Sequence, residues 1–136
     1  MWRTLLLRSW ILVLWAPLLS SIVFKGVVAD PSGTWHIDRV FDDDLGLVGV
    51  ELELRILPDG RVEGRSECGT FTGRWAVVEG HMRFAELRPG VAPCGYARLI
   101  ERKLFHALEQ AEGCRRSGNR LYLMSHERHI VVLRAT

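Results

Sequence analysis

Two histidines and three cysteines are the side chains of this 136-residue chain best suited to chemistry. His126 and His129 stand in Ser-His-Glu-Arg-His, which lacks the His-Glu-x-x-His spacing of a helical zinc site. Residues three apart on a strand face opposite sides, so an exposed turn between strands is the better interpretation. The cysteines, Cys68, Cys94 and Cys114, contain no Cys-x-x-Cys pair and therefore predict no zinc site.

The acidic and hydroxyl groups are equally weak as sites. Asp42, Asp43 and Asp44 follow one another directly, whereas a calcium loop alternates its oxygen ligands and ends in a glutamate. Ser66 lies outside any Gly-x-Ser-x-Gly turn, and its neighbours supply no base for a nucleophile. The sequence therefore predicts no catalytic, cofactor-binding or metal-binding residue, and we do not expect an enzyme.

The stretch Glu63 to Trp75, EGRSECGTFTGRW, holds three glycines and invites comparison with a phosphate-binding loop. Neither known glycine spacing for phosphate is present, and no helix follows to offer its N-terminus to an anion. Glycines inside strands instead mark bulges or close packing. The stretch therefore predicts a bent β-hairpin around Cys68, in which Phe71 packs against the small face that carries Gly64.

The first 29 residues have the composition of a secretory signal peptide. A short basic start precedes the uncharged apolar run of residues 10–24, and Val27 and Ala29 are the small residues expected before a cut at Asp30. The run is shorter than the ~20 residues of a spanning helix, which favours cleavage and a periplasmic or secreted domain, residues 30–136. The alternative is an uncleaved anchor in the inner membrane through residues 10–24.

Removal of the leader changes the charge of the protein. Of the 18 basic residues in the whole chain the leader carries three, which leaves 15 against 16 acidic residues. These charges are scattered, without the basic stripe that nucleic-acid binding requires. We therefore expect no nucleic-acid partner, and membrane contact only through the leader if it is retained.

The rest of the chain alternates short strands with turn signals. Gly33 to Val40 predicts a first strand. Apolar and charged residues alternate from Val50 to Ile56, and Pro-Asp-Gly follows as a tight turn. With the hairpin, this predicts a four-stranded meander that ends at Leu87. Two more strands, RLYLM and HIVVLRA, lie near the end of the chain.

One segment has the period of a helix. From about Ala97 to Ala111, apolar residues recur every three or four positions, which predicts an amphipathic helix with Leu104, Phe105 and Leu108 on the sheet and Glu101 on the opposite face. The fold class expected is a single small α+β domain. It combines a strongly bent, barrel-like antiparallel sheet of about seven strands with one packed helix, preceded by a signal peptide.

The order of these motifs resembles the META domain family, which includes the HslJ heat-shock protein of bacterial envelopes. The resemblance runs from Thr34 to Leu133: a tryptophan strand, an alternating strand with an Asp-Gly turn, a cysteine hairpin, a cysteine before the helix, and a Gly-x-x-Leu-x-Leu strand. The residues that carry it are Trp35, Cys68, Phe71, Gly73, Cys94, Glu101, Ala107 and Leu108. Gly69 replaces the family's asparagine, GVAPC shortens another motif, and Cys114 stands where the family tends to place an aromatic residue.

The resemblance implies an exported domain with no established catalysis. We expect a non-enzymatic envelope or periplasmic protein, stress-related by analogy, that binds an unknown protein or small molecule or gives structural support. The alternative is a lipocalin-like small-ligand binder or a protease-inhibitor-like β-barrel.

Export would place three cysteines in an oxidising compartment. Cys68 at a hairpin bend and Cys94 in a Pro/Gly-rich crossing are the expected disulfide, which closes a loop of about 27 residues worth ~3.5 kcal/mol in the chain-entropy model. Cys114, without a family counterpart, is then the free thiol. The alternative is three reduced, buried cysteines.

Overall fold

The computed structural model describes residues 28–136, so the predicted leader lies outside the described residues except for Val28 and Ala29. The described chain forms an antiparallel sheet, one short helix and one long helix. The elements are β1 (Gly33–Val40), β2 (Asp43–Asp44), α2 (Leu45–Val48), β3 (Glu53–Ile56), β4 (Arg61–Ser66), β5 (Gly69–Val78), β6 (His81–Arg88), α3 (Tyr96–Gln110), β7 (Gly113–Ser117), β8 (Arg120–Ser125) and β9 (Arg128–Ala135).

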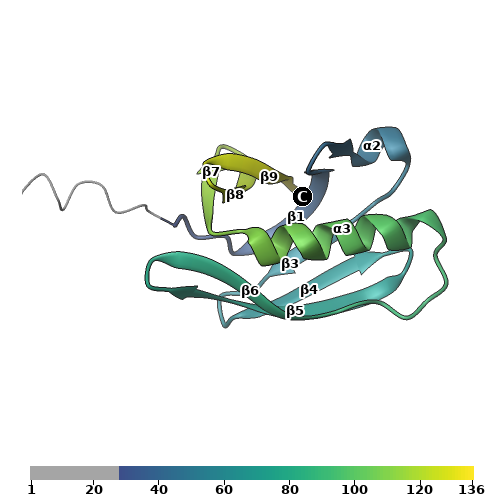
Figure 1. The fold of residues 1–136 in the computed structure, drawn as a ribbon, viewed down its shortest axis with the longest axis horizontal. Coiled ribbons are helices and arrows are strands. Elements are labelled where there is room, and N and C mark those ends of the chain that lie inside the picture. Colours follow the sequence, from purple (N-terminus) through teal and green to yellow (C-terminus); the bar gives the residue numbers. More distant parts are fainter. Residues whose placement is uncertain (1–27) are drawn as a thin grey trace, which may run out of the picture.

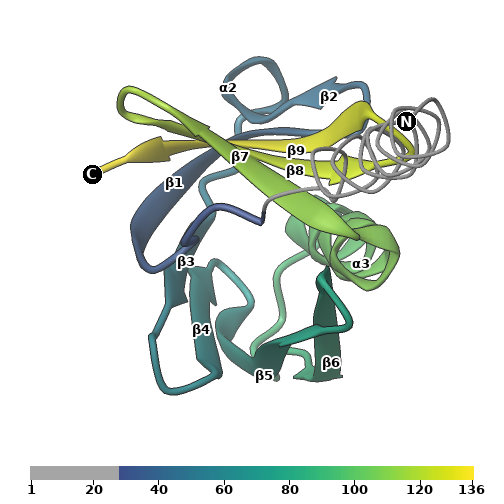
Figure 2. The same ribbon diagram turned by 90° about the vertical axis from the view of Figure 1, so that its left-hand side faces the viewer.

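The sheet curls around the long helix without closing. Its nine strands follow the order β6-β5-β4-β3-β1-β9-β8-β7, with β2 paired to β1. The edge strands β6 and β7 therefore lie on either side of α3, as Figure 2 shows. The backbone N–H of Met82 donates to the carbonyl oxygen of Glu112 at 2.7 Å, but no ladder joins β6 to β7 within residues 28–136. The predicted α+β fold, with a bent antiparallel sheet and one packed helix, is confirmed.

The two strands beyond the expected number, β2 and β7, come from segments without an alternating pattern. The strand expected from Val50 also starts later, at Glu53. The N–H of Val50 donates to the carbonyl oxygen of Leu45 at 3.1 Å and so closes the end of α2. Gly49 makes the required turn in the left-handed region at φ 72°. The N–H of Val50 is therefore bonded to the end of α2 and is not free to pair in the expected strand.

The hairpin of β4 and β5 has the close packing predicted for it. Gly64 lies directly opposite Phe71 in the strand register. A Cβ added at Gly64 would lie 1.8 Å from Cζ of Phe71, so the aromatic ring occupies the space of a side chain. Phe71 is fully buried and contacts Phe105 of α3 edge-on, with ring centroids 5.3 Å apart. Gly64 is therefore required by the fold.

The helix α3 covers the concave side of the sheet (Figure 1). Leu104 and Leu108 are fully buried and Phe105 packs partly buried beside them, as the apolar stripe predicted. Trp35 fills the core from β1, and its indole N–H donates to the carbonyl oxygen of Pro31 at 2.9 Å. Within residues 28–136 no helix is long and apolar enough to cross a bilayer.

Candidate functional site

The disulfide of the structure joins the hairpin to the crossing segment that leads into α3. Cys68 and Cys94 are bridged, with their Cα atoms 4.9 Å apart. Cys68 lies in the β4–β5 turn and is fully buried, while Cys94 lies just before the helix begins. The third cysteine, Cys114, is a free buried thiol in β7. This is the pairing expected from the sequence.

A buried ion pair holds the same crossing segment from the helix side. Nη1 of Arg98 lies 2.6 Å from Oε1 of Glu101, and the other carboxylate oxygen accepts the N–H of Gly90 at 3.4 Å. Arg98 also donates to the carbonyl oxygens of Gly90 at 2.6 Å and Ala92 at 2.9 Å. The guanidinium and the carboxylate thus pair with each other and satisfy three backbone groups of the crossing segment.

The expectation that Glu101 lies on the exposed face of the helix is wrong. Its side chain is only 1% exposed, because the crossing segment folds over this face of α3 and covers it. A carboxylate is tolerated there since Arg98 and the Gly90 N–H replace the water it loses.

The crossing segment packs directly on the hairpin turn. The N–H of Ala92 donates to the carbonyl oxygen of Cys68 at 3.0 Å. A Cβ at Gly90 would lie 2.2 Å from that same oxygen, so only glycine fits. Disulfide, ion pair and backbone contact therefore hold one loop from three sides.

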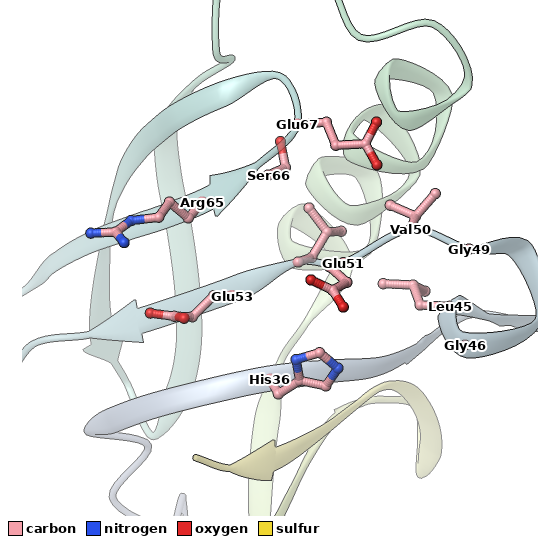
Figure 3. Close-up of a pocket in the computed structure, with 11 residues that line it drawn as sticks. His36, Leu45, Gly46, Gly49, Val50, Glu51, Glu53, Arg65, Ser66 and Glu67 are labelled. Atoms are coloured by element: carbon pink, nitrogen blue, oxygen red, sulfur yellow. The ribbon is translucent and has the colours of Figure 1, made fainter.

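An open groove of about 600 Å³ lies on the outer face of the sheet, between β1, β3, the end of β4 and α2. His36 of β1 and Glu51, which precedes β3, project into the same opening, as Figure 3 shows. The polar side chains that line it are His36, Glu51, Glu53, Arg65, Ser66 and Glu67.

The strand register places a row of charged and polar residues across this face. Arg65 lies opposite Glu53, and Glu53 lies opposite His36. His36 in turn lies opposite Arg134, and Arg134 opposite Arg120. Five strands thus contribute one residue each to a continuous row. The row begins with a positive and a negative residue, Arg65 and Glu53, and ends with two positive residues, Arg134 and Arg120.

A second groove, of about 530 Å³, continues the first on the other side of His36, which lines both. Its floor includes Tyr122 and His129, whose rings stack with centroids 4.4 Å apart. Arg134 pairs with Asp38 at 3.4 Å. We call the two openings together the outer groove; it offers an aromatic surface and charges of both signs.

The outer groove offers hydrogen-bond donors and acceptors and charges of both signs to solvent. Its charged and polar side chains are half-buried or exposed, so water screens their charges. Within residues 28–136 no three His, Cys, Asp or Glu side chains are arranged to hold a metal ion. Outside the groove, burial raises the pKa of the Cys114 thiol to about 11.

The acidic run and the two histidines have structural neighbours. Asp43 accepts a hydrogen bond from Nζ of Lys103 at 2.6 Å, which ties β2 to α3. Asp44 caps α2 by accepting the N–H of Leu47 at 3.2 Å. His126 lies exposed in the β8–β9 turn, as expected, whereas His129 joins the aromatic stack.

Sequence reasoning missed the outer groove and the ion pair. Arg98 and Glu101 stand three residues apart, a spacing that brings side chains together on a helix, and this was the available signal. The sequence held no signal for the row through His36, because the row depends on the pairing of strands that are distant in sequence, such as β1 and β9.

The comparisons with known proteins agree with this architecture. The model of the META domain matches residues 29–136. The chain belongs to the META domain family. Among solved structures, this META domain is similar to the crystal structure of a DUF4847 family protein from Bacteroides vulgatus ATCC 8482. Identity is 14% and the TM-score 0.56, over 85% of this chain and 96% of that chain, which shows a shared fold. No curated protein matches.

Proposed function

We propose that this META domain is an exported, non-enzymatic protein of the cell envelope that acts by binding through the outer groove. The observation that carries the binding role is the row of residues through His36, which five strands hold in fixed positions. The partner is a protein or small molecule of the envelope, and a role in stress follows the family resemblance.

Export is supported by two independent features. The leader has a basic start, an apolar run and small residues before Asp30. The Cys68–Cys94 disulfide is the kind of bond that persists in the periplasm or outside the cell and is rare in the cytosol. The alternative location, an inner-membrane anchor through residues 10–24, would place the domain in the same compartment.

Binding rather than catalysis is supported by the surroundings of the groove residues. Catalytic acids and bases usually sit in clefts that exclude water and shift their pKa. Glu51 and Arg65 are exposed, and His36 and Glu53 are half-buried. Such side chains suit hydrogen bonds and ion pairs with a partner.

The lipocalin-like alternative requires a ligand inside the sheet. In this domain Trp35, Phe71 and Leu104 are fully buried there, and Phe105 packs against them. A small ligand would therefore bind the outer groove, so both forms of the proposal share one surface.

The test is native mass spectrometry of the exported protein with a groove variant and a control. His36→Trp places a large side chain between both openings and should remove any bound species. Ala76→Trp, at an exposed position on β5, should retain it. A bound species that survives His36→Trp, or an exported protein that carries nothing, would contradict binding through the groove. Recovery of the protein from the cytosol with three reduced cysteines would contradict export.

A further inference from the structure

The first described residues form a strap along the edge strand β7. We define the N-terminal strap as Val28–Pro31. The N–H of Ala29 donates to the carbonyl oxygen of Cys114 at 3.3 Å, and the Cys114 thiol donates to the carbonyl oxygen of Ala29 at 2.9 Å. These two bonds make the first anchor of the strap.

A second anchor holds the other end of the strap. The carbonyl oxygen of Pro31 accepts the indole N–H of Trp35 at 2.9 Å. The guanidinium of Arg116 donates to the carbonyl oxygen of Asp30 at 3.4 Å and lies 5.0 Å from the centre of the Trp35 ring. Asp30 and Pro31 are therefore held independently of Ala29.

The strap covers two features that would otherwise face solvent. Val28 and Ala29 pack against the hydrophobic core, and Cys114 beneath them is only 4% exposed. β7 is the last strand of the sheet, and an uncovered edge strand is open to pairing with another chain.

The cut predicted from the sequence falls between the two anchors. A chain that begins at Asp30 loses both Ala29 bonds and the packing of Val28 and Ala29, while the contacts of Asp30 and Pro31 remain possible. We propose that the N-terminal strap is a cover that processing removes: a chain that keeps Ala29 holds the Cys114 thiol and the β7 edge closed, and a chain cut before Asp30 presents both.

The raised pKa of the Cys114 thiol sets how much its reactivity should increase when the strap is removed. Burial raises the pKa of Cys114 from an ordinary 9.0 to about 11, and only the thiolate attacks a disulfide. At a pH below 9.0, a fall of the Cys114 pKa from about 11 to 9.0 would raise the fraction of thiolate about 100-fold. Loss of the strap would also remove the side chains that block access of a reagent to the sulfur. Because part of β7 still surrounds the thiol and the Asp30 carboxylate stays near it, we expect an increase of at least tenfold.

The experiment measures how fast Cys114 in the folded, oxidised protein reacts with the aromatic disulfide DTNB at pH 8. The thiolate attacks one sulfur of the reagent, forms a mixed disulfide and releases one thionitrobenzoate anion, which is counted by absorbance. Two variants of the full chain disturb the strap. Ala29→Gln puts a neutral but larger side chain where Ala29 packs, and Ala29→Pro removes the backbone N–H that donates to the carbonyl oxygen of Cys114. Val78→Gln, on the exposed tip of the β5–β6 hairpin, is the control.

Both Ala29 variants should react at least tenfold faster than the unaltered full chain, and Val78→Gln should react at its rate. Exported protein that begins at Asp30 should show the fast rate. Tryptophan fluorescence must show unfolding slower than labelling, so that a fast reaction reports the strap and not loss of the fold. Equal rates in the unaltered chain and both Ala29 variants, or a slow rate in protein that begins at Asp30, would overturn the proposal.

Discussion

Removal of the Glu101 carboxylate should destabilise the domain far more than a surface glutamate would. Glu101→Ala leaves Arg98 without its counter-charge and the N–H of Gly90 without its acceptor. Breaking a buried pair by removing one partner costs ~3–5 kcal/mol. The Arg98 side chain is 26% exposed and keeps two carbonyl acceptors, so we expect a loss near the lower limit, ~3 kcal/mol.

Urea unfolding of the oxidised protein measures this loss directly. The midpoint should fall while the slope stays unchanged, because the folded and unfolded surfaces remain similar. Glu109→Ala, exposed on the same helix, is the matched control and should stay within about 0.5 kcal/mol.

A double variant tests whether the loss comes from the orphaned charge. Arg98→Met combined with Glu101→Leu should be more stable than Glu101→Leu alone, since no charge is then left unpaired. A cost at Glu101 as small as that at Glu109 would refute the buried-pair reasoning.

Three further perturbations test the core and the free thiol. Gly64→Ala should cost several kcal/mol or prevent folding, because its Cβ would overlap the ring of Phe71, whereas Gly113→Ala has open space; equal melting temperatures would contradict this packing. Leu104→Ala should cost ~2–5 kcal/mol in urea unfolding, and a loss below about 0.5 kcal/mol would mean that α3 does not pack there. The raised pKa of Cys114 favours the neutral thiol in the folded state, so its contribution is complete below pH 9.0 and lost as the pH rises to about 11. The unaltered full chain, which keeps Ala29, should therefore lose ~2–3 kcal/mol more than its Cys114→Ser variant between pH 8 and 11, and parallel losses would argue against a buried thiol.

Local patterns predicted the elements whose own residues determine them. The Leu104 stripe gave the helix, and the small face at Gly64 with the bulky Phe71 gave the bent hairpin. β7 was not predicted because Cys114 is its one buried residue, so apolar and polar residues do not alternate along it. An edge strand of this kind forms because β8 supplies hydrogen bonds, not because its side chains demand burial.

The site was less predictable because it depends on contacts between distant segments. Glu101 looked exposed on a helical projection, since nothing in the helix itself reveals that the crossing segment folds over it. The row through His36 joins β4, β3, β1, β9 and β8, an order that differs from the order of the chain. The spacing of apolar residues within one segment cannot predict which distant strands pair with one another.

We propose that this META domain is exported and carries, beside the outer groove, a crossing segment that the Cys68–Cys94 disulfide holds in place. Counting thiols and mapping disulfide-linked peptides in protein isolated from the cell envelope, denatured without reductant, tests it most directly. We predict one free thiol, at Cys114, and one linked peptide pair that contains Cys68 and Cys94. Three free thiols would contradict export into an oxidising compartment, and a peptide that joins Cys114 to either partner would contradict the Cys68–Cys94 pairing.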